Sequence, residues 1–232
     1  MIRCPSPLQA FSQGAIAVLP LSIACAPWGL LVGSMAIDAD LSPLQSQGFS
    51  IIVFAGAAQL VAIGMLKSGA SLFSILMTTL LLTSQHLLYG MHMRPTLSAL
   101  SSRWRLTLGF LLTDEFFALN SQRDPGAFDR WYALGVGLTF YLAWNLFTLA
   151  GIVMGHKVPG LEALGLEFSI AATFIALVTP LVRTVPIAVC VGVALFCSVF
   201  LSYWRYESAL VVSGIAGMAA GFFCKRCRQE KR

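Results

Sequence analysis

The sequence predicts an all-α membrane protein, a polytopic transmembrane bundle of about seven or eight segments, some of them broken or re-entrant. Of its 232 residues, 57% are hydrophobic and only 11% are charged, against roughly 25% charged in soluble domains. Several apolar stretches reach the roughly 20 residues that cross a hydrocarbon core of about 30 Å. The basic residues lie between these stretches and in a carboxyl-terminal tail, as expected when positive charge stays on the cytoplasmic side.

The apolar segments follow one another along the chain, and we expect all but one of them to span the membrane. The exception, Leu106–Leu119, is short and contains Asp114 and Glu115. It is either a half-helix that re-enters the membrane or a full span with a polar face. If it crosses, both chain ends are cytoplasmic, and if it re-enters, only the carboxyl end is. The segments are Phe11–Ile37, Gly48–Leu66, Ser71–Met91, Leu106–Leu119, Trp131–Gly155, Leu161–Leu181, Pro186–Tyr203 and Ser208–Phe223.

A faint internal repeat favours a single integral membrane transporter domain over residues 1–232. The run Gly29–Gly33 precedes a loop and the tripeptide Phe-Ser-Ile, and Gly151–Gly155 precedes another loop and the same tripeptide. The expected halves are 1–120 and 126–223, followed by a basic cytoplasmic tail, 224–232. With seven spans the repeat would be inverted, as in many transporters whose substrate site lies between the halves, and with eight it would be parallel.

Composition argues against several other functions. The net charge is +5, but the basic residues do not form a face interleaved with aromatics, so we expect no nucleic acid partner. Cys224 and Cys227 form a C-x-x-C without a second pair, so we expect no metal and no cofactor. The motifs G-x-S-x-G and H-E-x-x-H are absent from the sequence, which argues against an intramembrane enzyme.

Helix-breaking and amide residues mark the first two segments. Pro27, followed closely by Gly29, should bend or break the first span and free backbone groups that can bind an ion or a carboxylate. The run Phe54-Ala-Gly56-Ala-Ala-Gln59 brings small residues and an amide into the second. Gln59 either forms a hydrogen bond between helices or lines a substrate path.

Charged and titratable residues mark the next two segments. Four polar residues, Thr83-Ser84-Gln85-His86, surround the third, where His86 either carries a proton or bonds a neighbouring helix. Asp114 and Glu115 lie about 100° apart on a helix, so at least one should face a cavity or an aqueous mouth. Carboxylates in the membrane suit an ammonium group or a proton, unless this segment end is interfacial.

In the second half of the chain, Asn145 lies in one span with Trp144 and Thr148, and Glu167 heads another. Glu167 fits the role of a helix cap, because a negative charge is favourable at a helix amino end. Asn145 is therefore the better candidate for the site.

In order and spacing, these residues resemble the AzlC family, the large subunits of branched-chain amino acid exporters that include the YgaZ-like proteins. The resemblance covers almost the whole chain. One departure concerns position 85, where the family usually has an Arg in an Asn-x-Arg-His pattern and this chain has Gln. The motifs are Pro20 with Pro27-Trp28-Gly29, Phe54 to Gln59, His86-Leu-Leu-Tyr89 ending in Arg94-Pro95, Leu111 to Leu119, and Gly165 to Phe168.

The resemblance implies export of hydrophobic amino acids such as valine, leucine, isoleucine or methionine across the bacterial inner membrane. It also implies a small AzlD/YgaH-like membrane subunit as partner. A non-transporting scaffold or channel subunit is the competing interpretation. We expect the substrate to contact Pro27, Gly29, Phe54, Gly56, Gln59, Asp114, Glu115 and Asn145, and a coupling proton to use His86, Asp114 or Glu115.

Overall fold

The computed structural model describes residues 6–121, 128–157, 175, 179, 182–204, 206 and 209–229. These residues contain helices and no strand, which confirms the predicted all-α fold. The chain forms two compact units, Met1–Ile170 and Ala171–Arg232. Four helices in the described part are long and apolar enough to cross a membrane: Pro7–Ala24, Leu72–Leu97, Arg130–Gly155 and Val185–Tyr203.

The first unit begins with a helix that is broken in two, as predicted. α1 (Pro7–Ala24) starts with a capping box between Ser6 and Gln9, and α2 (Ala26–Asp38) has a proline in its first turn. The break lies at Cys25, whose carbonyl accepts hydrogen bonds from two amides of α2, those of Trp28 and Gly29. At 1.5 Å per residue the two halves together are about 48 Å long.

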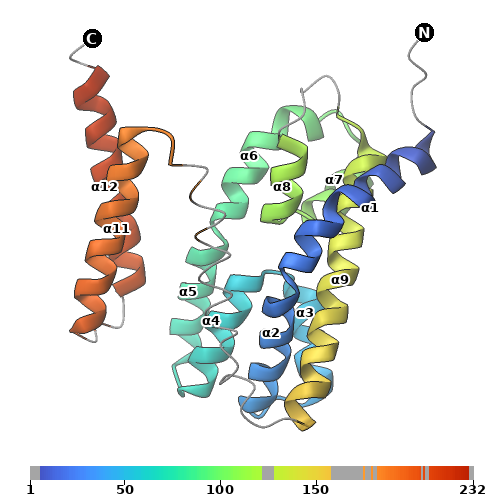
Figure 1. Cartoon of the computed structure of the whole chain (residues 1–232), viewed down its shortest axis with the longest axis horizontal. Coiled ribbons are helices and arrows are strands. Elements are labelled where there is room, and N and C mark those ends of the chain that lie inside the picture. Colours follow the sequence, from blue (N-terminus) through green and yellow to red (C-terminus); the bar gives the residue numbers. More distant parts are fainter. Residues whose placement is uncertain are drawn as a thin grey trace. The chain divides into compact units, whose positions relative to one another are not determined.

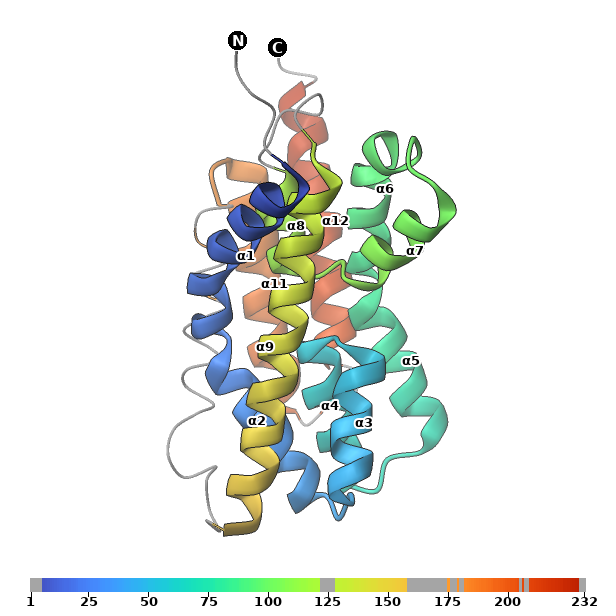
Figure 2. The ribbon, with the colours of Figure 1, turned by 90° about the vertical axis from the view of Figure 1, so that its right-hand side faces the viewer.

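The second segment is a hairpin. α3 (Pro43–Val53) and α4 (Gly56–Lys67) are joined at Phe54, whose φ of 42° and ψ of 48° are left-handed. Figures 1 and 2 show the two helices side by side in opposite directions. Each is about 17 Å long, roughly half a hydrocarbon core. The prediction of one continuous span over Gly48–Leu66 is therefore wrong, because the chain reverses at Phe54.

A second broken helix and a second hairpin follow. α5 (Leu72–Thr83) and α6 (Gln85–Leu97) are separated only by Ser84. α7 (Ser102–Phe110) and α8 (Asp114–Ser121) form the hairpin, with its turn at 111–113. The segment Leu106–Leu119 is therefore not one continuous span, in agreement with the re-entrant alternative.

The first unit thus contains one motif twice, in opposite orientations. A broken helix followed by a half-length hairpin describes α1 to α4 and again α5 to α8, and the two hairpins enter from opposite ends of the bundle (Figures 1 and 2). This inverted pair lies wholly within residues 7–121. The repeat predicted between 1–120 and 126–223 stays a prediction, because its second half includes residues 158–174, outside the described part of the chain.

α9 (Arg130–Lys157) is the long helix against which α1, α2, α3, α7 and α8 pack. Glycines bring its backbone close to α1 and α2. A side chain at Gly135 would overlap the carbonyl of Phe11, and one at Gly33 would overlap the carbonyl of Thr148. Small residues at both faces therefore allow the close helix contact that is common in membrane proteins.

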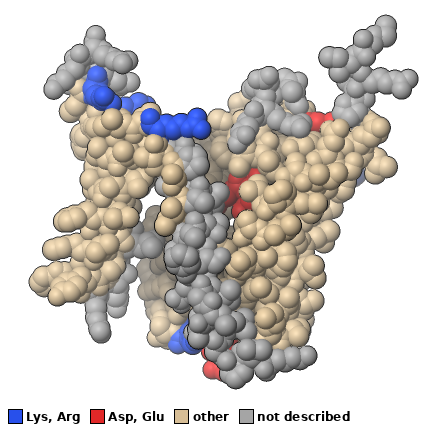
Figure 3. Space-filling view, in the orientation of Figure 1, with Lys and Arg blue, Asp and Glu red and all other residues tan. Residues whose placement is uncertain are grey.

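In the second unit, α11 (Val185–Tyr203) packs against α12 (Ala209–Gln229). Residues 224–229, predicted as part of a separate basic tail, continue α12 as a helix. The predicted span Leu161–Leu181, with Glu167, lies outside the described residues except for 175 and 179. On the face seen in Figure 3, charged atoms lie mainly near the upper and lower edges of the view, and acidic atoms are also visible in the otherwise uncharged surface between them.

Candidate functional site

The turns of the two hairpins meet beside the middle of α9. Phe54, at the turn of α3 and α4, lies 6.0 Å from Phe140 and 5.0 Å from Tyr141 between ring centroids. Its ring is also 6.1 Å from that of Phe110, the last residue of α7. At the other turn, the side chain of Leu111 contacts α9 at Gly137. Both reversals of the chain therefore lie at the same level of the bundle.

The breaks in the two long helices both contact one pair of acidic residues, Asp114 and Glu115, which we call the acidic pair. Asp114 and Glu115 form the first turn of α8, and both are half-buried. The Cys25 thiol donates to Glu115 Oε1 at 3.4 Å, and the Gln85 amide donates to Asp114 Oδ1 at 3.3 Å. Each carboxylate thus faces a different helix break, Glu115 that of α1 and α2 and Asp114 that of α5 and α6.

The partners of the acidic pair in these two contacts are uncharged. A guanidinium at position 85 would form an ion pair with Asp114, whereas the amide of Gln85 contributes a neutral hydrogen bond. The carboxylates are favourable at the amino end of α8, because the helix dipole is positive there. The site can therefore accept an added positive charge, either an ammonium group or a proton.

The helix amino ends at the breaks carry partial positive charge, which complements the negative charge of the acidic pair. α2, α4 and α6 start at the breaks, and their N-cap residues Cys25, Ala55 and Ser84 make no side-chain capping bond. The first amides of a helix have no partner within the helix, and they carry a partial positive charge. α1, α3, α5 and α7 end at the same breaks, with carbonyl groups. The arrangement therefore offers both amide and carbonyl ends inside the bundle, as suits a zwitterion.

The left-handed conformation of Phe54 is strained, since a bulky residue there costs on the order of 1 kcal/mol or more. Rings from α7 and α9 surround it, and its side chain is 5% exposed. The Tyr141 hydroxyl also donates to the carbonyl of Ile51 at 3.1 Å, just before the turn. Contacts with neighbouring helices therefore hold a conformation that the local sequence does not favour.

A second cluster, the α9 network, fastens the hairpin of α3 and α4 to α9. Gln59 is fully buried, donates to Ser50 Oγ at 2.9 Å and accepts from the Trp144 indole at 3.2 Å. The Ser50 and Thr148 hydroxyls are 3.0 Å apart. In this structure the amide of Gln59 connects helices.

Asn145 extends the α9 network toward the first half of α3. Its Oδ1 accepts from the Gln47 amide at 2.9 Å, and its own amide donates to the carbonyl of Tyr141 at 2.9 Å. Gly56 lies under the indole of Trp144, where an added Cβ would be 2.8 Å from Cη2. Both predicted site residues thus pack at the contact between the hairpin and α9.

The structure therefore divides the predicted site residues into two groups. Pro27 is grouped with the acidic pair by its place two residues after Cys25, which bonds Glu115. Gly29 instead faces α9, where an added Cβ would be 2.6 Å from that of Phe147. The group at the acidic pair is Pro27, His86, Asp114 and Glu115, and the group at α9 is Gly29, Phe54, Gly56, Gln59 and Asn145.

His86 directly follows Gln85 and is half-buried. Its Nδ1 lies 3.0 Å from the carbonyl of Thr83, and its ring is 6.0 Å from that of Tyr89. Tyr89 in turn stacks on Phe117 of α8, with 4.4 Å between ring centroids. These contacts place the imidazole at the start of α6, one residue from the group that bonds Asp114.

Sequence reasoning missed Cys25 and Gln85 as partners of the acidic pair, and Ser50 and Thr148 as partners of Gln59. The signal for Cys25 was its place just before Ala26-Pro27, where a break was expected. Ser50 and Thr148 gave no such signal, since isolated hydroxyls are common in apolar helices. Among the described residues, no group of three or more His, Cys, Asp or Glu side chains could hold a metal ion.

Comparisons with known proteins find a family model and several relatives of this chain. A family model described as AzlC protein matches residues 20–158, which include the four breaks and both clusters. The inner membrane protein YgaZ of Escherichia coli K12 is 28% identical over 226 residues, 94% of this chain and 83% of the relative. The branched-chain amino acid transport protein AzlC of Bacillus subtilis 168 is 27% identical over 151 residues, 64% of this chain and 59% of the relative. No solved structure matches.

Proposed function

The chain belongs to the AzlC family, and from this premise we propose that it exports hydrophobic amino acids, such as valine, leucine, isoleucine or methionine, from the bacterial cytoplasm. One observation carries the proposal. Asp114 and Glu115, the acidic pair, follow the turn between α7 and α8 and contact the breaks of both long helices, where their hydrogen-bond partners Gln85 and Cys25 are neutral. A relative named for branched-chain amino acid transport supports the substrate class.

In this proposal the substrate is held by its two charged groups. Its ammonium group pairs with Asp114, whose carboxylate already accepts a hydrogen bond on one oxygen. Its carboxylate meets the first amides of α4, whose N-cap residue Ala55 makes no side-chain capping bond, because a helix dipole favours negative charge there. The apolar side chain then lies against the aromatic residues of the hairpin turns, such as Phe54 and Phe116.

The inverted arrangement supports alternating access as the transport mechanism. One hairpin enters from each end of the bundle, so each separates the centre from one side of the membrane (Figure 2). Displacing one hairpin while the other stays packed on α9 would open the centre to a single side, as inverted repeats allow. Glu115, with His86 nearby, carries the coupling proton in this scheme.

The remaining assignments also belong to the proposal. The protein is a multi-pass protein of the inner membrane, and it acts with a small AzlD/YgaH-like membrane subunit rather than as an enzyme. Lys225, Arg226 and Arg228 in the last turns of α12 support a cytoplasmic carboxyl end, since basic residues stay on that side.

Uptake of labelled valine into everted membrane vesicles tests the proposal. We expect Asp114→Asn to lower the initial rate by about tenfold or more, because one lost ion pair costs about 1.4 kcal/mol or more of substrate binding. Glu115→Gln should abolish the dependence on a proton gradient and leave valine exchange in place. Asp38→Asn is the matched control, since Asp38 is an exposed acid at the end of α2. Wild-type transport by Asp114→Asn would contradict the proposal.

A further inference from the structure

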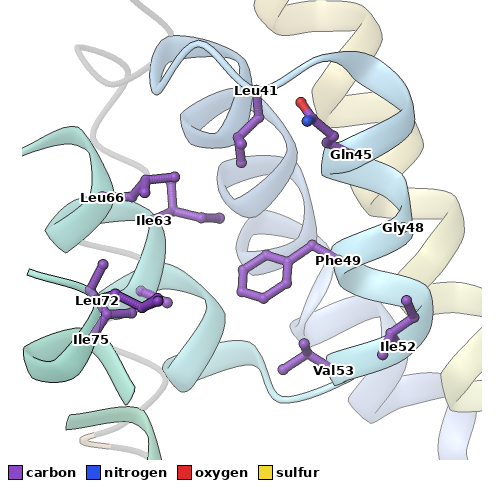
Figure 4. Close-up of a pocket in the computed structure, with 11 residues that line it drawn as sticks. Leu41, Gln45, Gly48, Phe49, Ile52, Val53, Ile63, Leu66, Leu72 and Ile75 are labelled. Carbon is purple, nitrogen blue, oxygen red and sulfur yellow. The ribbon is translucent and has the colours of Figure 1, made fainter. Parts of the chain in front are cut away.

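A cavity of about 480 Å³ lies between α3, α4 and the start of α5 (Figure 4). It is separate from the acidic pair and from the α9 network, with which it shares no residue. Figure 4 shows Phe49 of α3 and Ile63 of α4 pointing toward one another into this space. The lining residues are Leu41, Gln45, Gly48, Phe49, Ile52, Val53, Ala62, Ile63, Leu66, Leu72 and Ile75.

The lining selects a hydrocarbon ligand. Gln45 is the one lining residue with a polar side chain. A free amino acid would bury an ammonium and a carboxylate there without partners, at a cost of several kcal/mol. The chemistry of the cavity therefore does not suit the substrate proposed for the centre of the bundle, and it suits an alkyl chain.

The rim of the cavity is apolar and exposed. Ile52 is 74% exposed and Leu72 is 71% exposed. Leu72 is also the first residue of the candidate span Leu72–Leu97. The most apolar part of this span is not buried in the protein. Lipid tails surround such a helix in a membrane, so a hydrocarbon ligand is present at the rim.

The length and polarity of the cavity match one lipid tail. From Gln45 to Val53, at the hairpin turn, α3 rises about 12 Å, close to the roughly 15 Å of a single leaflet's hydrocarbon. A transmembrane helix of a partner protein would instead need a groove about 30 Å long, the full thickness of the hydrocarbon core. At the outer end, Lys67 follows the lining residue Leu66 and is exposed. A lysine at that level complements an anionic headgroup.

We propose that this cavity binds one acyl chain of an anionic phospholipid, with the headgroup beside Lys67 and the end of the chain beside Val53. The α9 network holds one side of the hairpin of α3 and α4, and the acyl chain fills the other. The site is independent of the transported substrate, so it stands whether or not the protein exports amino acids.

Two glycines allow a matched test. A Cβ added at Gly48 or at Gly64 meets no atom within 4 Å, so both positions accept a side chain, but only Gly48 lines the cavity. Native mass spectrometry of the full-length protein with phosphatidylglycerol should show one tightly retained lipid for the wild type and for Gly64→Phe. Gly48→Phe should lose that lipid, because its ring occupies the space of the chain.

Thermal unfolding shows whether Gly48→Phe loses the lipid because its ring fills the cavity or because the protein is misfolded. Added phosphatidylglycerol should raise the melting temperature of the wild type and of Gly64→Phe. Gly48→Phe should melt at least as high as the lipid-free wild type and show no such rise. Equal lipid retention by all three proteins would overturn the proposal, and so would retention of an amino acid or a peptide in place of the lipid.

Discussion

The two half-length hairpins differ in what their turns contact. The hairpin of α3 and α4 is held to α9 by neutral hydrogen bonds through Gln59 and Asn145. That of α7 and α8 meets α9 mainly through apolar contacts at Gly137, and it carries the acidic pair, which contacts the two other helix breaks. The same fold element thus occurs twice in opposite orientations. One copy is fixed to α9 by hydrogen bonds, and the other carries the charged side chains.

The largest expected effect concerns the apolar contact of α7 and α8 with α9. In Gly137→Leu the new side chain overlaps Leu111, whose Cβ would be 2.7 Å away, and Phe116. We expect valine transport in vesicles to fall by roughly tenfold or more, because displacement of the turn moves both carboxylates from their partners.

Gly109→Leu is the control for Gly137→Leu, since a Cβ at Gly109 in α7 meets nothing within 4 Å. It should transport at nearly the wild-type rate. Equal loss in both variants would show that the position of this turn does not determine transport, and the division between the hairpins would then fail.

A moderate effect on stability is expected at the other hairpin. Gln59→Leu removes two hydrogen bonds, those to Ser50 and Trp144. At about 0.6 to 1 kcal/mol for each bond between membrane helices, the free energy of unfolding should fall by roughly 1–2 kcal/mol. Denaturant titration in detergent micelles measures this change, and transport per folded molecule should change less than in Gly137→Leu. A variant that is fully stable but inactive would place Gln59 in the substrate path.

The smallest effect is expected for Tyr141→Phe. The variant loses only the hydrogen bond to the carbonyl of Ile51 and keeps the ring against Phe54. The same titration should show a loss of about 0.5–1 kcal/mol. A loss as large as that of Gln59→Leu would mean that this hydroxyl, rather than the buried amide, fastens the hairpin.

Features of the candidate site that depend on single residues or short motifs could be predicted from the sequence. Pro27 removes a backbone donor, so a break near it follows from the residue itself. Asp114 and Glu115 stand out because charges in apolar segments are costly and need a partner. The all-α fold followed in the same way from the length of the apolar stretches.

Other features depend on contacts between distant residues and could not be predicted. Gly48–Leu66 has the composition and length of a simple span, and its reversal occurs at Phe54, a residue that disfavours the left-handed conformation. Rings from α7 and α9 hold it there. The pairing of Cys25 with Glu115 is equally non-local, because 90 residues separate the two in sequence.

The close backbone contact of α1 and α2 with α9 has a consequence for the order of assembly. The ribosome makes α1 and α2 first, and the helix whose glycines they contact only after both hairpins have been synthesised. Until α9 arrives, neither turn has its contacts with the long helix, those of Phe54 with Phe140 and of Leu111 with Gly137. Insertion of α9 therefore completes the packing of both turns, and a chain truncated before residue 130 would lack these contacts.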